Sequence, residues 1–157
     1  MKITDILAQR GKTLFTVKTN TSAFDAVKIM DENKVGAVIV LDEKDKVAGI
    51  LSERDVLYKC YKSGKRLKEQ TVNNLMTDVD DILIGKMDDT PKELMNVMLY
   101  RRIRHIPIID GNEIAGMLSV EDILKMMLDS IENESHLLRQ HIKNPMGIHD
   151  FSSHLKK

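Results

Sequence analysis

The chain has 157 residues, 42% of them hydrophobic, which is enough for one ordinary domain or for two small units that share a core. Lysine plus arginine and aspartate plus glutamate each number 24, so the formal net charge is zero and no general affinity for nucleic acid or anionic membranes is expected. The single cysteine, Cys60, excludes an internal disulfide, the opening segment lacks the apolar core of a secretion signal, and no apolar run approaches the roughly 20 residues that span a bilayer. We therefore expect a cytoplasmic protein.

Two long segments of the chain repeat each other. KVAGILSERDVL at 46–57 and EIAGMLSVEDIL at 113–124 share six of twelve residues at a register of 67. Upstream, residues 21–42 align with residues 89–110 at a register of 68 through their apolar positions. The repeated unit therefore has about 55 residues, and the chain is expected to contain two copies of one small fold.

The first copy has the pattern of a strand, a helix, two strands and a helix. LFTV at 14–17 predicts a short strand, and Ser22 with Asp25 has the spacing of a capping box at a helix start. VGAVIVL at 35–41 and KVAGIL at 46–51 are apolar runs rich in β-branched residues, separated by a polar turn, and they predict a pair of strands. A second helix is expected to begin near Ser52.

The second copy shows the same order. DILI at 81–84 predicts its first strand, and Thr90 with Glu93 predicts a helix start, with Pro91 where a helix accepts proline. The runs at 103–109 and 113–118 flank Asp110-Gly111-Asn112, which favours a hairpin.

The last helix is expected to begin near Ser119 and to stop at Asn144-Pro145. It stays apolar along one face well beyond the repeat. Such an extension predicts a helix that pairs with a second copy of the chain, which would make a homodimer.

These features together resemble a tandem pair of CBS domains, a Bateman module. The resemblance covers about residues 1–130 and rests on the repeated pattern, on RHIPIID at 104–110 followed by G-x-x-S-x-x-D, and on NNLMT at 73–77 between the copies. It implies an α+β fold in which two βαββα units, related by a pseudo-twofold axis, pack through their sheets and are followed by a C-terminal helical extension. The implied division is 1–66 for the first unit, 67–130 for the second, and 131–157 for the extension and tail.

The resemblance also implies two clefts between the units that bind adenosine compounds such as AMP, ADP, ATP, NAD or S-adenosylmethionine. The carboxylates of Asp55 and Asp122, one turn into their helices, can accept both hydrogens of a ribose cis-diol. Ser52 and Ser119 lie at helix N-termini, which favour phosphate. An ordinary capping box is the alternative for S-x-x-D. Because the pattern occurs twice in a chain that resembles a CBS pair, we favour ribose contact.

Arg104 and His105 are predicted to supply positive charge for a phosphate, because the resemblance places basic groups here that face the opposite half-site. The alternative is that both side chains lie at a solvated sheet edge. By the pseudo-twofold, Arg54 is expected to point toward the cleft that holds Asp122, and Glu121 toward the cleft that holds Asp55. The Asp122 cleft is therefore predicted to accept an anionic nucleotide more readily. The base is expected to contact apolar strand residues and backbone groups near Gly36, Ala37, Val38, Ile106, Pro107 and Ile108.

Nothing in the sequence indicates catalysis. We find no Cys-His, Ser-His-Asp, Walker or metal-ligand spacing, and Cys60 has no evident base beside it, so no catalytic residue, metal or permanent cofactor is expected. Four histidines fall in the last 22 residues, where solvent exposure is favoured over metal binding. They are His136, His141, His149 and His154.

We therefore predict a regulatory module that senses an adenosine compound and signals to an unidentified protein partner. A ligand-independent dimeric scaffold or interaction protein is the alternative. Binding of nucleic acid through the basic cluster at 101–105 is disfavoured by the zero net charge.

Overall fold

The computed structural model describes residues 2–10 and 14–141 of the chain, which divides into two compact units, Met1–Ile123 and Leu124–Lys157. The helix end expected at Asn144-Pro145, together with His149 and His154, lies outside the described residues. Of His136 and His141 only the backbone is described.

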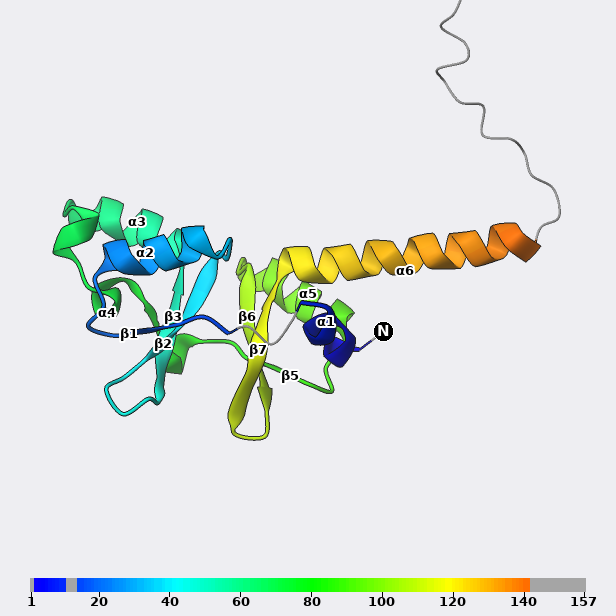
Figure 1. Ribbon diagram of the computed structural model, residues 1–157, viewed down its shortest axis with the longest axis horizontal. Coiled ribbons are helices and arrows are strands. Elements are labelled where there is room, and N and C mark those ends of the chain that lie inside the picture. The colour runs from blue at the N-terminus through cyan, green and yellow to red at the C-terminus, as the bar shows by residue number, and fades with distance from the viewer. Residues whose placement is uncertain (1, 11–13, 142–157) are drawn as a thin grey trace, which may run out of the picture. The chain divides into compact units, whose positions relative to one another are not determined.

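The predicted order of strand, helix, strand, strand and helix is present twice, and the fold is α+β (Figure 1). The first repeat consists of β1, α2, β2, β3 and α3, and the second of β5, α5, β6, β7 and α6. The elements in chain order are α1 (Ile3–Arg10), β1 (Thr16–Lys18), α2 (Ala23–Glu32), β2 (Ala37–Leu41), β3 (Val47–Ser52), α3 (Glu53–Ser63), a 3-10 helix (Leu67–Glu69), α4 (Val72–Leu75), β4 (Thr77–Asp78), a 3-10 helix (Val79–Asp81), β5 (Gly85–Lys86), α5 (Pro91–Arg101), β6 (His105–Asp110), β7 (Glu113–Ser119) and α6 (Val120–His141).

Each repeat forms its own sheet, and the two sheets follow one plan. In the first, β1 runs parallel to β2, β2 pairs antiparallel with β3, and β4 adds an antiparallel edge. In the second, β5 runs parallel to β6 and β6 pairs antiparallel with β7. Both hairpins have an irregularity at matching places, between Val40 and Leu41 and between Ile108 and Ile109. The duplication seen in the sequence is thus a duplication of strand pairing.

Helix starts follow the predicted capping residues. The Thr90 hydroxyl accepts from the backbone N–H of Glu93, whose carboxylate accepts in return from the backbone N–H of Thr90, and Pro91 opens α5. Ser22 caps α2 by accepting from the backbone N–H of Asp25 at 3.0 Å. These contacts satisfy N–H groups that a helix start leaves unpaired.

One predicted strand is misplaced. DILI at 81–84 was expected to form the first strand of the second repeat, but β5 begins at Gly85. A 3-10 helix ends at Asp81, and Ile82 packs against the apolar cluster that holds Ile39 and Ile50. Gly85 pairs with Ile108, and a Cβ there would lie 2.7 Å from the end of the Ile108 side chain, so this buried position leaves little room for a larger residue.

The first sheet has an apolar cluster on each of its two faces, because alternate residues of a strand face opposite sides. On one side of the first sheet, Val38, Val40 and Leu51 pack with buried residues of α2 and α4. On the other side, a cluster joins the two repeats through the buried side chains of Ala37, Ile39, Ile50 and Met117. The repeats therefore pack through their sheets, as predicted.

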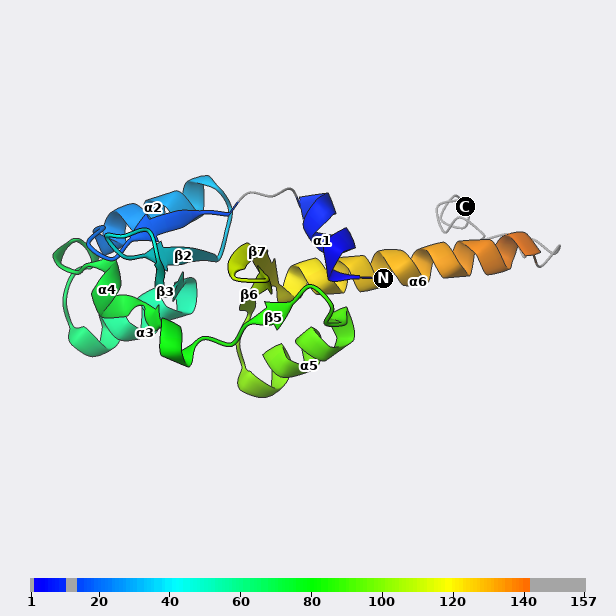
Figure 2. The same cartoon turned by 90° about the horizontal axis from the view of Figure 1, so that it is seen from below.

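Contacts also cross the boundary predicted at residue 66. Leu7 of α1 lies against Gly116 of β7, where an added Cβ would be 2.6 Å from the leucine side chain. In the other direction, the chain after β4 runs from the first sheet to β5 (Figure 2). Residues near the start of the chain thus complete the second repeat, and β4 completes the first sheet.

The α6 helix extends past the second repeat. Leu124, Leu128 and Ile131 recur at helical spacing and are exposed. In the described part of the chain, no helix combines the length and the apolar character that crossing a membrane requires.

Candidate functional site

Two cavities adjoin the two repeated aspartates. The larger, of about 1010 Å³, is here called the Asp122 cavity, and the smaller, of about 220 Å³, the Asp55 cavity. Ligand pockets usually span about 300–1,000 Å³. The Asp122 cavity is therefore large enough for a whole nucleotide, and the Asp55 cavity, in its present shape, for part of one.

Each aspartate is held by a capping box. The backbone N–H and the hydroxyl of Ser52 donate to Asp55 Oδ2 at 3.0 and 2.6 Å. The backbone N–H and the hydroxyl of Ser119 donate to Asp122 Oδ2, both at 2.7 Å. The structural role that was the alternative for S-x-x-D is therefore present at both helix starts, and each carboxylate also lines a cavity.

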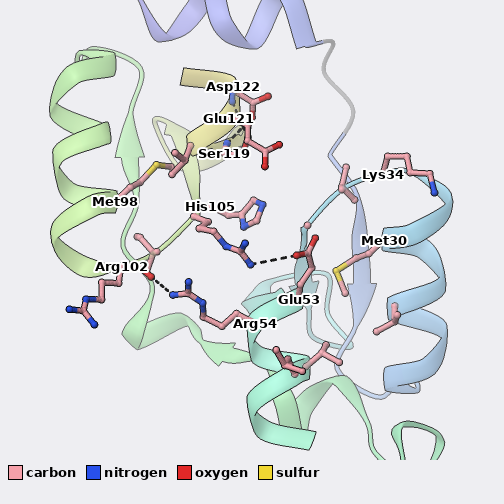
Figure 3. A pocket seen from close by; sticks show the side chains of 18 of the residues that line it. Met30, Lys34, Glu53, Arg54, Met98, Arg102, His105, Ser119, Glu121 and Asp122 are labelled. Atoms are coloured by element: carbon pink, nitrogen blue, oxygen red, sulfur yellow. Dashed lines mark hydrogen bonds and ion pairs between the residues drawn. The ribbon is translucent and has the colours of Figure 1, made fainter. Parts of the chain in front are cut away.

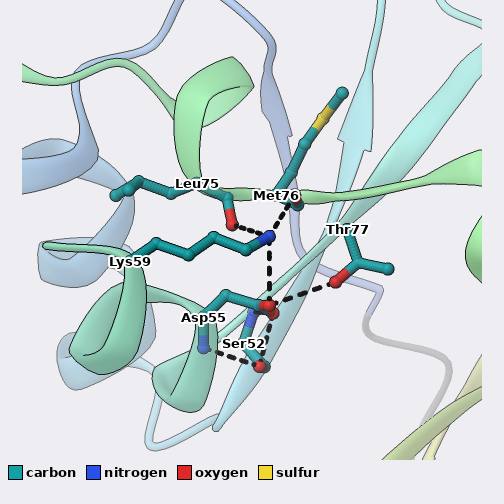
Figure 4. A network of polar contacts seen from close by, with 6 residues as sticks. All are labelled: Ser52, Asp55, Lys59, Leu75, Met76 and Thr77. Atoms are coloured by element: carbon teal, nitrogen blue, oxygen red, sulfur yellow. Dashed lines mark hydrogen bonds and ion pairs between the residues drawn. The ribbon is translucent and has the colours of Figure 1, made fainter. Parts of the chain in front are cut away.

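Asp55 has two further donors, which come from different parts of the chain (Figure 4). The Thr77 hydroxyl donates to Asp55 Oδ1 at 3.1 Å, and Lys59 Nζ lies 3.4 Å from the same oxygen. Lys59 also donates to the carbonyl oxygens of Leu75 and Met76 at 2.8 and 2.6 Å. The Asp55 side chain is only 16% exposed, so this network is partly shielded from water.

The two cavities share one wall. Arg54 of α3 lines both, as do four consecutive residues of the second repeat, Arg102, Ile103, Arg104 and His105. Arg54 donates to the carbonyl oxygen of Arg102, which ends α5 in a left-handed conformation with φ 55°. Arg104 forms an ion pair with Glu53 at 3.5 Å. The wall is thus built where the first turn of α3 meets the segment that precedes β6.

Gly36 makes this meeting close. A Cβ at Gly36 would lie 2.8 Å from Glu53 Oε1 and 2.8 Å from the His105 ring. Glycine therefore lets the backbone before β2 approach side chains from both repeats without a steric clash.

The predicted charge difference between the clefts is wrong. Glu121 lines the Asp122 cavity, and the described lining of the Asp55 cavity does not include it. Arg54 and Arg104 line both cavities and do not distinguish them. Glu121 follows β7 directly on the first turn of α6, beside Asp122, so both side chains reach the same cavity (Figure 3).

The charge balance consequently favours an anion in the Asp55 cavity. Four arginines line this cavity, Arg54, Arg101, Arg102 and Arg104, against two aspartates. The Asp122 cavity is lined by four cationic side chains and four carboxylates, so their formal charges cancel. Arginine forms strong bidentate hydrogen bonds with phosphate, so the smaller cavity provides the better phosphate environment.

The residues expected near the base are divided between cavity and core. Gly36 lines the Asp122 cavity and Pro107 the Asp55 cavity. The other four are buried and absent from the described linings of both cavities: Ala37, Val38, Ile106 and Ile108. Their contact with a base stays a prediction.

Sequence reasoning missed several cavity residues. Lys59 lies four residues after Asp55 on one helix, a spacing that brings side chains together, so it could have been found. Thr77, 22 residues from Asp55, and Glu53, paired with Arg104 51 residues away, give no local signal. In the described residues, no group of three or more His, Cys, Asp and Glu side chains is arranged to hold a metal ion.

Comparison with known proteins agrees with this architecture. The sequence model of the CBS domain matches residues 5–62 and 72–129. The mitochondrial CBS domain-containing protein CBSX3 of Arabidopsis thaliana is 30% identical over 147 residues, which cover 90% of this chain and 71% of that protein. A putative signal-transduction protein with CBS domains from Burkholderia ambifaria is 30% identical with a TM-score of 0.77, over 82% of this chain and 95% of that one.

A more distant structure shares the fold. The CBS domain pair of protein MJ0100, solved in complex with 5′-methylthioadenosine and S-adenosyl-L-methionine, has a TM-score of 0.70 at 21% identity, over 83% of this chain and 98% of that one. The two matches to the CBS domain together span well over half of the chain. The chain therefore belongs to the CBS-domain family and carries two CBS domains in tandem.

Proposed function

We propose that this protein is a regulatory module that binds an adenosine-containing ligand, and that it is not an enzyme. The observation that carries the proposal is the duplicated aspartate: Asp55 and Asp122 each lie at the first turn of a helix and each line a cavity beside a shared arginine wall. The adenosine ligands of the MJ0100 pair support the same ligand class for this fold.

The geometry suggests a division of tasks within each cavity. The carboxylate accepts hydrogen bonds from the two ribose hydroxyls, which are charge-assisted and therefore strong. The guanidinium groups of Arg54 and Arg104 bind the phosphates. Backbone groups at Gly36 and the ring of Pro107 border the space for the base. Such apolar and backbone contacts select a purine loosely. Discrimination between ligands with different numbers of phosphates therefore depends on the arginines.

Signalling requires that the ligand bind two states of the protein with different affinity. The shared wall joins α3 of the first repeat to the α5–β6 connection of the second, so a ligand that contacts the wall alters how the repeats meet. We propose that a partner protein detects this change. We also propose that the protein is a homodimer, which the exposed apolar residues of α6 support. We further propose that it acts in the cytoplasm.

Calorimetric titration tests the function directly. AMP, ADP, ATP, NAD and S-adenosylmethionine are titrated into the wild type and into the Asp55→Asn and Asp122→Asn variants. Hydrogen bonds to a charged group contribute about 1.5–3 kcal/mol, so loss of the charge in an occupied cavity is expected to weaken binding at least about ten-fold. Asp88→Asn is the matched control, because Asp88 is exposed and outside both described linings.

Two outcomes contradict the proposal. If all five ligands fail to bind the folded protein, the ligand-independent scaffold is the better account. If a ligand binds and neither aspartate variant weakens it, the binding site lies elsewhere.

A further inference from the structure

The segment that joins the two repeats is attached to α3 through Asp55. This joining segment is defined here as residues 75–78, which end α4 and form β4. Lys59 binds its carbonyl groups at Leu75 and Met76, and Thr77 binds Asp55 (Figure 4). Among the described residues, Thr77 is the only hydrogen-bond partner of the Asp55 side chain beyond its own helix start, so the attachment of Thr77 to α3 depends on Oδ1 of this carboxylate.

The Asp55 carboxylate has little spare capacity in this arrangement. A carboxylate offers about four acceptor positions. Ser52 fills two of them at Oδ2 and Thr77 fills one at Oδ1, beside which Lys59 Nζ lies as an ion pair at 3.4 Å. A ribose cis-diol needs two positions, so binding through both hydroxyls must displace a donor that is already present.

The donors at Oδ1 are the ones that can be displaced. The two Ser52 contacts measure 2.6 and 3.0 Å and come from the helix cap itself. The Thr77 and Lys59 contacts, at 3.1 and 3.4 Å, are longer and hence weaker. Lys59 keeps two carbonyl acceptors if it leaves Asp55, whereas Asp55 is the acceptor of the Thr77 hydroxyl.

The two halves of the joining segment are held differently. Leu75 is buried and Met76 packs against the core of the first repeat. Thr77 and Asp78 form β4, which pairs with β3 through two residue pairs, Gly49 with Asp78 and Ile50 with Thr77. A few residues later, Ile82 and Leu83 line the Asp55 cavity itself. A ligand in this cavity thus borders both the joining segment, at Thr77, and the chain that leads into the second repeat.

The second repeat has no lysine at the position that corresponds to Lys59. At a register of 67, the position of Lys59 is occupied by Met126 in the second repeat. Methionine cannot donate to a carboxylate or to carbonyl groups. The two aspartates, although they arose as copies, therefore do not have the same neighbours.

We propose that ribose hydroxyls compete with Thr77 for Asp55, and that occupation of the Asp55 cavity releases residues 77 and 78 of the joining segment from α3. This inference rests on the proposed function, because it requires an adenosine ligand at Asp55. It adds a route by which the ligand alters the connection between the two repeats, and it makes Thr77 a residue that opposes ligand binding.

The test compares Thr77→Val with Thr71→Val. Valine keeps the shape and strand preference of threonine without the hydroxyl, and Thr71 is a matched control because its side chain makes no capping hydrogen bond. In an Asp122→Asn background, which confines ribose binding to Asp55, Thr77→Val is expected to bind AMP or ADP about five-fold tighter, since one competing hydrogen bond is removed. Amide hydrogen exchange of residues 77 and 78 provides the second measurement.

Three exchange results are expected. Without ligand, the amides of residues 77 and 78 exchange faster in Thr77→Val than in the wild type or in Thr71→Val. With saturating ADP, the wild type approaches the rate of Thr77→Val, and Thr77→Val itself changes little.

The possible failures are distinguishable. Weaker or unchanged binding by Thr77→Val overturns the competition while leaving the proposed function intact, because Thr77 would then assist the ligand or play no part. Binding of ADP that leaves the exchange of residues 77 and 78 unchanged also overturns this inference alone. Absence of binding in all variants overturns both proposals.

Discussion

The guanidinium of Arg54 in the first repeat donates a hydrogen bond to the carbonyl oxygen of Arg102 in the second. Arg102 ends α5 in a left-handed conformation, and both residues line both cavities. The contact therefore joins the repeats at the place where a phosphate is expected to bind. An anion in either cavity competes with the Arg102 carbonyl for the same guanidinium.

Replacing Arg54 is expected to affect charged ligands selectively. Arg54→Gln should weaken ATP about ten-fold, the size of one charge-assisted hydrogen bond, and should weaken uncharged adenosine much less. Calorimetry at low and high salt measures the difference, and Arg54→Lys, which keeps the charge without the planar fork, should fall between. An equal loss for ATP and adenosine would mean that Arg54 acts only by holding the repeats together.

Replacing Glu121 is expected to have the opposite effect. Its carboxylate lines the Asp122 cavity, where it repels a phosphate. Glu121→Gln should therefore strengthen ATP binding a few-fold relative to adenosine, as expected for a partly solvated charge. Glu132→Gln, an exposed position farther along α6, serves as the control. If Glu121→Gln leaves the ratio of the two affinities unchanged, no phosphate binds near this residue.

Two glycines should respond differently to alanine. At Gly49 an added Cβ would lie 2.4 Å from the carbonyl oxygen of Thr77, a backbone atom that can move only with β4. Gly49→Ala should lower the free energy of unfolding by about 2 kcal/mol, within the usual range for overpacking. At Gly36 the Cβ would meet the end of the Glu53 side chain and the His105 ring, which can turn aside, so Gly36→Ala should cost less. Urea unfolding measures the loss of stability in both variants. A larger loss for Gly36→Ala than for Gly49→Ala would contradict the prediction.

The capping box of α5 should make stability depend on acid pH. The backbone N–H of Thr90, and then its hydroxyl, hold the pKa of Glu93 below its ordinary value of 4.5. A carboxylate with a lowered folded pKa contributes stability that is complete above its unfolded pKa and lost as pH falls through the folded one. Glu93→Gln should therefore lower the Tm at neutral pH, and the difference from wild type should shrink as pH falls below 4.5. A constant difference across the acid range would show that charge is not involved.

Much of the fold could be predicted because its determinants are local and occur twice. The hairpins, helix starts and strand order follow from apolar runs, turn residues and capping pairs within a few positions of each other, as at Ser52 and Asp55. The strand predicted at 81–84 failed because apolar residues also fill cores and cavity walls. Ile82 does so, while the strand itself begins at Gly85, a residue with low strand preference.

The site was predictable in its residues and less so in their arrangement. Asp55, Asp122, Arg54, Arg104 and Ser119 all line a cavity. Which cavity Glu121 lines depends on how the two repeats are turned against each other, and a pseudo-twofold axis inferred from sequence does not determine this. The Asp55–Thr77 contact depends on strand pairing between β3 and β4, which sequence periodicity does not reveal for a two-residue strand.

A crystal structure of the protein grown with saturating ADP tests the central claim most directly. The account predicts the two ribose hydroxyls within hydrogen-bond distance of Asp55 or Asp122, with the phosphates toward Arg54 and Arg104. Where Asp55 is the residue used, Thr77 should no longer contact its carboxylate. A nucleotide bound away from both aspartates, with both capping boxes and the Arg54–Arg102 contact unchanged, would contradict it.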